Sequence, residues 1–219
     1  MHILFIGNSH TYMHKMPWIL KALAAAHDDV GPVEPDQCTG NGVSLGWHWR
    51  SPDTRSRISA GGWDFVVLQE RSGGTIENPE GFFRHARLLD SDIRAAGAKT
   101  VFYMTWAGRD RPGDQALISA AYRRAAADCG ALLAPVGTAW QRALAEHSDW
   151  HLHHPDGRHA GPSGAYLTAC VFFRLLCGAS PVGLPGRIHA KGKLRVDLSP
   201  EQARFFQRVA SDEVDANSG

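Results

Sequence analysis

The chain has 219 residues, of which 43% are hydrophobic and 21% are charged, and its formal net charge is +1. This composition is ordinary for a globular protein, and the near-neutral charge offers no broad basic field that would attract nucleic acid or an acidic membrane surface. No apolar run approaches the roughly 20 residues that a membrane-spanning helix needs. We therefore expect one domain over residues 1–219, with neither nucleic acid nor a membrane as a partner.

Four cysteines, Cys38, Cys129, Cys170 and Cys177, are spread along the chain without a Cys-x-x-Cys pair. That spacing argues against a zinc ribbon or a thioredoxin-like redox site and predicts reduced thiols. The chain starts with a strand-like apolar run, and no basic segment with an apolar signal core precedes it. We expect a cytoplasmic protein, and its oligomeric state stays open.

Five short runs of apolar, partly β-branched residues predict strands. The first run stops abruptly at Gly7, which is typical of a strand buried on both faces of a parallel sheet. Pro32 and Pro35 weaken the second run, which favours a position at the edge of the sheet. The predicted strands cover residues 3–6, 33–38, 63–70, 99–105 and 131–136.

Amphipathic or alanine-rich segments between these runs predict helices. Pro17 suits a first helical position because its missing N–H is not needed there, and Gly130 is a typical helix stop. The predicted helices cover residues 17–27, 51–60, 80–96, 114–129, 139–146 and 161–176, with a last one after Ser199. We expect the last few residues of the chain to be frayed.

Strands and helices alternate along the chain, with no internal repeat. This order predicts an α/β fold, a three-layer α/β/α sandwich around a mostly parallel five-stranded sheet. Polar residues follow the carboxyl ends of several predicted strands, beginning with Ser9 and continuing with Gln69 and Glu70. Because ligands bind at that edge of open α/β sheets, we expect the functional site there.

A serine hydroxyl needs a base to take its proton, and that base needs an acceptor on its other nitrogen. One stretch offers both groups compactly, residues 151–159, where Asp156 and His159 stand in an Asp-x-x-His spacing. That spacing allows the carboxylate to reach Nδ1 of His159 within one turn and leaves Nε2 free to face Ser9. Attack of Ser9 on an ester or amide would create an oxyanion, for which the N–H groups of Ser9 and Gly42 and the amide of Gln69 are candidate donors.

These motifs resemble the conserved blocks of the SGNH (GDSL-type) hydrolases. The segment from Gly7 to Thr11 is similar to their first block, the glycine of the loop 40–44 to their second, and the segment from Asp156 to His159 to their last. The third block departs from the family, since Val67-Leu68-Gln69-Glu70 stands where a Gly-x-Asn-Asp motif is usual. The chain therefore resembles a divergent SGNH subgroup whose substrates are poorly assigned.

The resemblance implies a flavodoxin-like SGNH hydrolase fold with no cofactor. It also implies that Ser9 is the nucleophile, His159 the base and Asp156 its partner, and that the N–H groups of Ser9 and Gly42 bind the oxyanion. The asparagine of the family's third block has no exact match here. We therefore assign the third oxyanion donor to Gln69, because its side-chain amide can donate a hydrogen bond. The expected activity is hydrolysis of a small acyl ester, such as an acetyl ester, of a carbohydrate or another small molecule.

Other interpretations stay open at this stage. Ser9 could cap a helix, and Gly40 rather than Gly42 could be the second-block glycine. Gln69 and Glu70 could make purely structural hydrogen bonds, and Trp106 could be a core residue or line an acyl or sugar pocket.

Two other classes of protein also remain possible. The histidines of residues 151–159, with Asp156, are metal-ligand types, so a metal-dependent hydrolase is an alternative. A non-catalytic module that binds a carbohydrate or an acyl group on the same fold is another.

Overall fold

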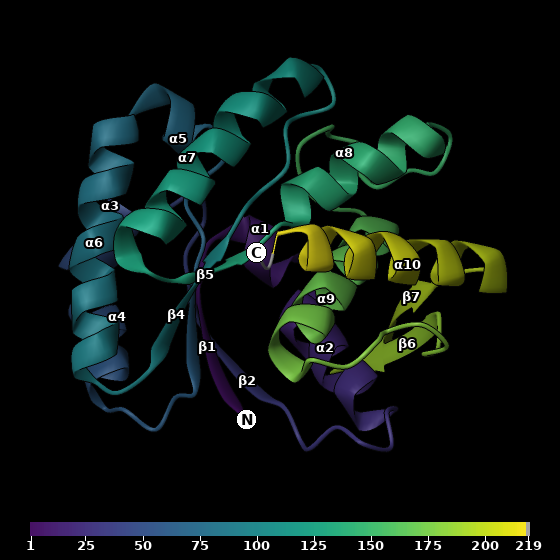
Figure 1. Ribbon diagram of the computed structural model, residues 1–219, viewed down its shortest axis with the longest axis horizontal. Helices are drawn as coiled ribbons and strands as arrows, with labels where there is room; N and C mark the ends of the chain where they lie inside the picture. Colours follow the sequence, from purple (N-terminus) through teal and green to yellow (C-terminus); the bar gives the residue numbers. More distant parts are fainter. Residues whose placement is uncertain (218–219) are drawn as a thin grey trace.

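A parallel sheet of five strands forms the centre of the computed structural model, which describes residues 1–217 (Figure 1). The strand order is β2-β1-β3-β4-β5, and every neighbouring pair is parallel. The strands are β1 (His2–Gly7), β2 (Glu34–Thr39), β3 (Phe65–Leu68), β4 (Lys99–Tyr103) and β5 (Leu132–Ala134). The predicted parallel sheet is confirmed, and the proline-containing strand β2 lies at its edge, as expected.

Helices cover both faces of this sheet and complete the predicted α/β/α sandwich. One face is covered by α3 (Leu45–Arg50), α4 (Pro52–Ser59), α5 (Gly74–Glu77), α6 (Pro79–Ala95) and α7 (Gln115–Cys129). The other face is covered by α2 (Met16–Ala25), α8 (Val136–Glu146), α9 (Pro162–Cys177) and α10 (Pro200–Ala216). The short helix α1 (Ser9–Tyr12) follows directly on β1.

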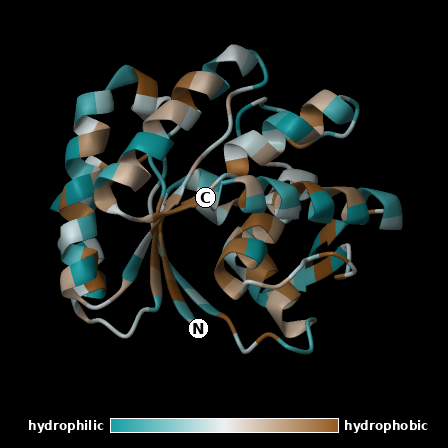
Figure 2. Cartoon of the chain, viewed as in Figure 1, coloured by the Kyte–Doolittle hydropathy of each residue, from teal (hydrophilic) through white to brown (hydrophobic). Residues whose placement is uncertain are grey.

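Each face of the sheet contributes its own half of the core. Alternate residues of β1 point to opposite sides, so that Phe5 packs edge-on against Phe172 of α9 while Leu4 joins the cluster under α6 and α7. In Figure 2 the central strands of the sheet are mostly hydrophobic, whereas the edge strand β2 and the helices mix hydrophobic and hydrophilic positions. This distribution is what strands buried on both faces require.

Several elements differ from the expectation. The helices α1, α3 and α5 do not follow from the sequence pattern, because each is one or two short turns with no repeated apolar spacing. An antiparallel hairpin, β6 (Arg187–Ala190) and β7 (Lys193–Asp197), was also missed. Lys191 and Gly192, which connect its strands, both have positive φ, but the Lys-Gly pair lacks the Asn or Asp that usually signals such a turn.

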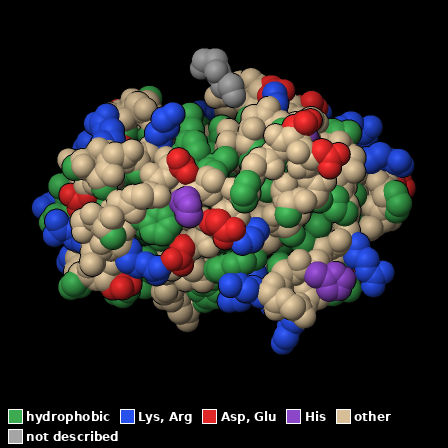
Figure 3. All heavy atoms as spheres, turned by 90° about the horizontal axis from the view of Figure 1, so that it is seen from below, with side chains coloured by type: hydrophobic (Ala, Val, Ile, Leu, Met, Phe, Trp, Pro, Cys, Tyr) green, Lys and Arg blue, Asp and Glu red, His purple; other side chains and the backbone are tan. Residues whose placement is uncertain are grey.

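The molecular surface is mixed in charge. On the face seen from below in Figure 3, basic, acidic and apolar side chains are interspersed.

The described helices are all too short or too polar to span a bilayer. All four cysteines are free thiols. The last helix continues to Ala216, and the expected fraying of residues 218–219 lies outside the described residues.

The packing of α9 against α8 depends on Gly164. A Cβ at this position would collide with the Trp140 ring and lie 2.5 Å from the carbonyl oxygen of Leu152. We expect Gly164→Ala to lower the free energy of unfolding by about 1–3 kcal/mol, the usual cost of overpacking. The measurement is the midpoint of urea unfolding at unchanged slope. Gly113→Ala is the matched control, because a Cβ there meets no atom within 4 Å. Equal midpoints for the two variants would contradict this packing.

Candidate active site

Ser9 lies where β1 gives way to helix α1, at the carboxyl edge of the central strands. The side-chain oxygen of Asn8 caps this helix by accepting from the backbone N–H of His10 at 3.1 Å. Ser9 is therefore the first helical residue and does not itself cap the helix. Its side chain is nearly buried but lines a cavity at this edge.

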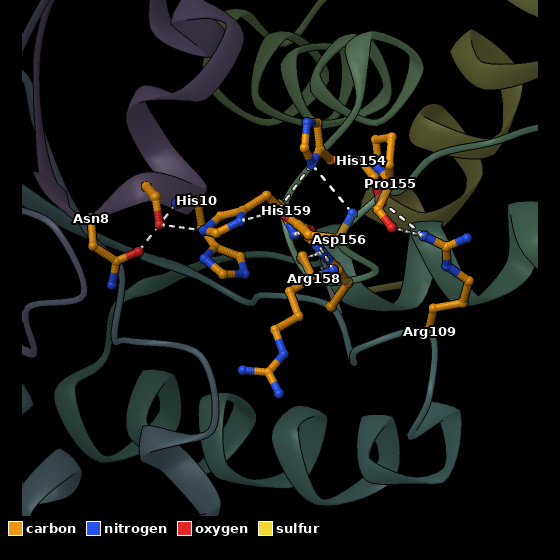
Figure 4. A network of polar contacts seen from close by, with 10 residues as sticks. Asn8, His10, Arg109, His154, Pro155, Asp156, Arg158 and His159 are labelled. Atoms are coloured by element: carbon orange, nitrogen blue, oxygen red, sulfur yellow. Dashed lines mark hydrogen bonds and ion pairs between the residues drawn. The ribbon is translucent and has the colours of Figure 1, made fainter.

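Three side chains form a continuous hydrogen-bonded chain from Ser9. The Ser9 Oγ atom lies 2.8 Å from Nε2 of His159, 150 residues later, and Nδ1 of His159 lies 2.8 Å from Oδ2 of Asp156 (Figure 4). Because the carboxylate can only accept at Nδ1, that nitrogen carries the proton and Nε2 is left to accept from the hydroxyl. This is the arrangement in which an imidazole can activate a serine.

The turn that carries Asp156 and His159 orients both side chains. Oδ1 of Asp156 accepts the backbone N–H groups of Arg158 at 2.9 Å and of His159 at 3.0 Å, while Oδ2 faces the His159 ring. Partial burial opposes ionisation of this carboxyl group, but the bonds from the His159 ring and these N–H groups hold its pKa well below its usual range. Asp156 therefore stays a carboxylate throughout the neutral pH range.

The loop 153–159 is fastened to the segment 106–109, which follows β4. Nε1 of Trp106 donates to the carbonyl oxygen of Arg158 at 2.8 Å, and Nε2 of His153 lies 3.0 Å from that of Ala107. The guanidinium group of Arg109 donates to the carbonyl oxygens of His154 and Pro155, as Figure 4 shows. These bonds fix the loop, and with it the position of the His159 ring relative to Ser9.

His10 was not singled out from the sequence, although it follows Ser9 directly. Its ring is buried, with its centroid 4.8 Å from that of Trp106 and 5.4 Å from that of His159. Burial, and secondarily the neighbouring His159, lower the pKa of His10 to about 3. The ring beside His159 is therefore neutral at physiological pH and adds no repelling charge when His159 takes up a proton.

Ser9 and His159 line a cavity of about 380 Å³ that also includes Gly42 and Trp106. Gly42 has a φ of +62°, a conformation that favours glycine, and it brings the loop 40–44 to the wall of the cavity. Charged side chains form much of the remaining wall: Arg71, Glu77, Asp110, Arg111, Asp114 and Arg158. The cavity thus presents many groups that can hydrogen-bond a polar ligand.

Gln69 does not line this cavity. Its side chain is fully buried, and Oε1 accepts from the backbone N–H of Asn8 and from the Thr11 hydroxyl, each at 2.9 Å. Its Nε2 donates to Oδ1 of Asn8 and to the carbonyl oxygen of Glu70. Both amide hydrogens are thus used within the protein, and in this arrangement Gln69 supports the Asn8–Thr11 turn instead of offering a donor to an oxyanion.

Two further buried side chains hold the loops around Ser9. The carboxylate of Glu70 accepts the backbone N–H groups of Leu45 at 3.1 Å and Arg71 at 2.8 Å, and burial raises its pKa. Nε2 of His48 lies 2.8 Å from the carbonyl oxygen of Gly7. The structural interpretation of Glu70 agrees with these bonds, whereas no sequence pattern indicated the role of His48.

The rings of His154 and His159 both contact Asp156, whereas that of His153 has a different partner. His153 faces Ala107, and the His154 ring lies 2.9 Å from Oδ2 of Asp156. In the part of the chain that is described, no group of three or more His, Cys, Asp or Glu side chains is arranged to hold a metal ion. The alternative of a metal-dependent hydrolase finds no ligand set among these residues.

Known structures resemble the fold of this chain, although no family model and no curated protein matches it. A candidate SGNH hydrolase from Slackia heliotrinireducens is 31% identical over 80% of this chain and 97% of its own, with a TM-score of 0.70. An acetylxylan esterase from Geobacillus stearothermophilus is 13% identical over 79% and 92%, with a TM-score of 0.61. An esterase from Pseudoalteromonas sp. is 15% identical over 77% and 92%, with a TM-score of 0.59. The last two identities are low and show a shared fold alone.

Replacement of Gln69 tests its structural role. Gln69→Leu leaves the N–H of Asn8 and the Thr11 hydroxyl buried without this acceptor, so we expect the free energy of unfolding to fall by roughly 2 kcal/mol or more. The measurement is urea unfolding, and Gln141→Leu on the exposed face of α8 is the control. A Gln69→Leu protein of unchanged stability but lower kcat would show instead that Gln69 is free to bind the reacting group.

Proposed function

Because the chain belongs to the SGNH hydrolase superfamily, we propose that it is a serine esterase that removes a small acyl group, such as acetyl, from a carbohydrate or another small hydroxyl compound. The observation that carries the proposal is the chain of hydrogen bonds from Ser9 through His159 to Asp156. The family membership supports ester hydrolysis, and the geometry supports a reaction through Ser9.

In this proposal His159 Nε2 takes the Ser9 proton as Oγ attacks the ester carbonyl carbon, and the imidazolium is stabilised by the Asp156 carboxylate. The N–H groups of Ser9 and Gly42 bind the oxyanion of the tetrahedral intermediate. His159 then gives its proton to the leaving alkoxide, which departs as the alcohol and leaves an acyl group on Ser9. Water, deprotonated by the same nitrogen, releases the carboxylic acid and restores the hydroxyl.

The polar wall of the cavity supports a hydroxyl-rich substrate. Its arginine and carboxylate side chains can donate to and accept from the many hydroxyl groups of a sugar. The similar structure from Geobacillus stearothermophilus is an acetylxylan esterase, which agrees with this class of substrate. The four free thiols fit a reducing compartment, and a cytoplasmic location is part of the proposal.

Removal of the nucleophile is the direct test. Ser9→Ala is expected to lower kcat for p-nitrophenyl acetate by up to about 10⁶-fold, the scale seen when a serine triad loses its nucleophile. A fluorophosphonate should label the unchanged protein once, on the peptide that contains Ser9. Near-normal turnover by Ser9→Ala, or a label on a different serine, would refute the assignment.

The orienting carboxylate gives a second test. Asp156→Asn should lower kcat by about 10³–10⁴-fold, because an amide cannot stabilise the imidazolium and favours the wrong tautomer of His159. His154→Gln changes the other ring beside Asp156 and should have less than a tenth of this effect. Equal losses in the two variants would argue against a specific role for the carboxylate.

A further inference from the structure

A second cavity lies beside the one that contains Ser9. It has a volume of about 410 Å³ and is formed by α8, the loop 148–153 and the segment that follows β4. Volumes of this size hold small ligands in proteins, usually against apolar and aromatic walls. We call it the aromatic cavity. Its lining includes the side chains of Trp106, Trp140, Leu144, Ala145, Trp150 and Leu152.

The rings of Trp106 and Trp140 are almost completely buried, and the more accessible apolar side chains of the aromatic cavity are those of Leu144, Ala145 and Trp150. Trp106 and Trp140 are stacked with ring centroids 3.9 Å apart and an interplanar angle of 1°. Both ring N–H groups already have acceptors, since Trp106 donates to the carbonyl oxygen of Arg158 and Trp140 to the Thr168 hydroxyl. These two rings thus bring no free donor to the cavity, and Leu144, Ala145 and Trp150 offer accessible carbon surface, which favours an apolar occupant.

Three consecutive residues, Trp106, Ala107 and Gly108, line both the aromatic cavity and the Ser9 cavity. Because successive Cα atoms are 3.8 Å apart, this common wall is roughly 8 Å long at most, measured along the backbone from Trp106 to Gly108. The wall is also fixed in place by its bonds to the loop 153–158. Both cavities are therefore formed before a ligand binds, and they adjoin each other along this segment.

We propose that the aromatic cavity binds an apolar group, such as a phenyl ring or a short alkyl chain, in the alcohol part of the ester substrate. This proposal rests on the proposed esterase function. The ester and its polar substituents lie in the Ser9 cavity, and the apolar group extends past residues 106–108 into the adjoining aromatic cavity. The natural substrate is accordingly an amphipathic ester, such as an acylated glycoside that carries an apolar aglycone.

Acetate esters of increasing alcohol length test this proposal. Ethyl acetate is compared with the acetates of 2-phenylethanol, 3-phenylpropanol and 4-phenylbutanol, measured as kcat/KM. Burial of a phenyl group should raise kcat/KM by about tenfold or more once the linker is long enough for the ring to enter the aromatic cavity. A flat series, in which no phenyl ester exceeds ethyl acetate, would overturn the proposal.

Filling the cavity separates its role from general hydrophobicity. Ala145→Phe places a ring in the aromatic cavity and should reduce the ratio of kcat/KM between the best phenyl ester and ethyl acetate to near one. Ala127→Phe is the matched control, because Ala127 is exposed on α7 and lines neither cavity; it should keep the ratio of the unchanged protein. An unchanged ratio in Ala145→Phe would also overturn the proposal.

A binding experiment distinguishes failure of this proposal from failure of the esterase assignment. The alcohol 4-phenylbutanol is titrated into the Ser9→Ala protein, and the change in tryptophan fluorescence is followed. If no ester is hydrolysed but the alcohol binds and Ala145→Phe weakens that binding at least tenfold, the cavity assignment stands without the esterase. If acetates are hydrolysed but 4-phenylbutanol does not bind, the cavity assignment fails and the esterase remains.

Discussion

The contact between Ser9 Oγ and His159 Nε2 is 2.8 Å long and joins the start of helix α1 to a loop 150 residues later. A hydroxyl can be activated by an imidazole only within such a distance, so the chemistry depends on how firmly the two backbones are held. The Ser9 side is held by the network of Asn8 and Gln69 beneath the turn. The His159 side is held by the carboxylate of Asp156 and by the segment 106–109.

The segment 106–109 therefore has more than one role. It holds the loop of the base, separates two cavities of different character, and places the Trp106 ring against His10. The His10 ring lies beside the His159 ring and is itself neutral, because burial lowers its pKa to about 3. The segment borders a polar cavity and an apolar cavity. This pair of cavities suits a ligand with one polar part and one apolar part.

Much of this arrangement follows from the sequence by local rules. The buried strand that ends at Gly7 and the short Asp-x-x-His spacing placed Ser9, Asp156 and His159 at one edge of the sheet, and the structure brings them together. Gln69 was placed at the correct edge, but the direction of its side chain depends on Asn8 and Thr11, which are some sixty residues away in sequence.

The features that were missed depend on contacts between distant segments. The stack of Trp106 and Trp140 and the aromatic cavity beside it depend on packing between the segment that follows β4 and α8, which no local pattern contains. The neutral state of His10 likewise depends on burial by residues that are remote in sequence. The β6–β7 hairpin was missed for the local reason that its turn lacks the usual residues.

The most direct measurement is a crystal structure of the protein after reaction with a small alkyl phosphonate. We predict a covalent phosphorus–oxygen bond to Ser9. The phosphoryl oxygen should lie within hydrogen-bond distance of the N–H groups of Ser9 and Gly42, and His159 should still be hydrogen-bonded to Asp156. An unmodified Ser9, or an adduct whose phosphoryl oxygen points away from both N–H groups, would contradict it.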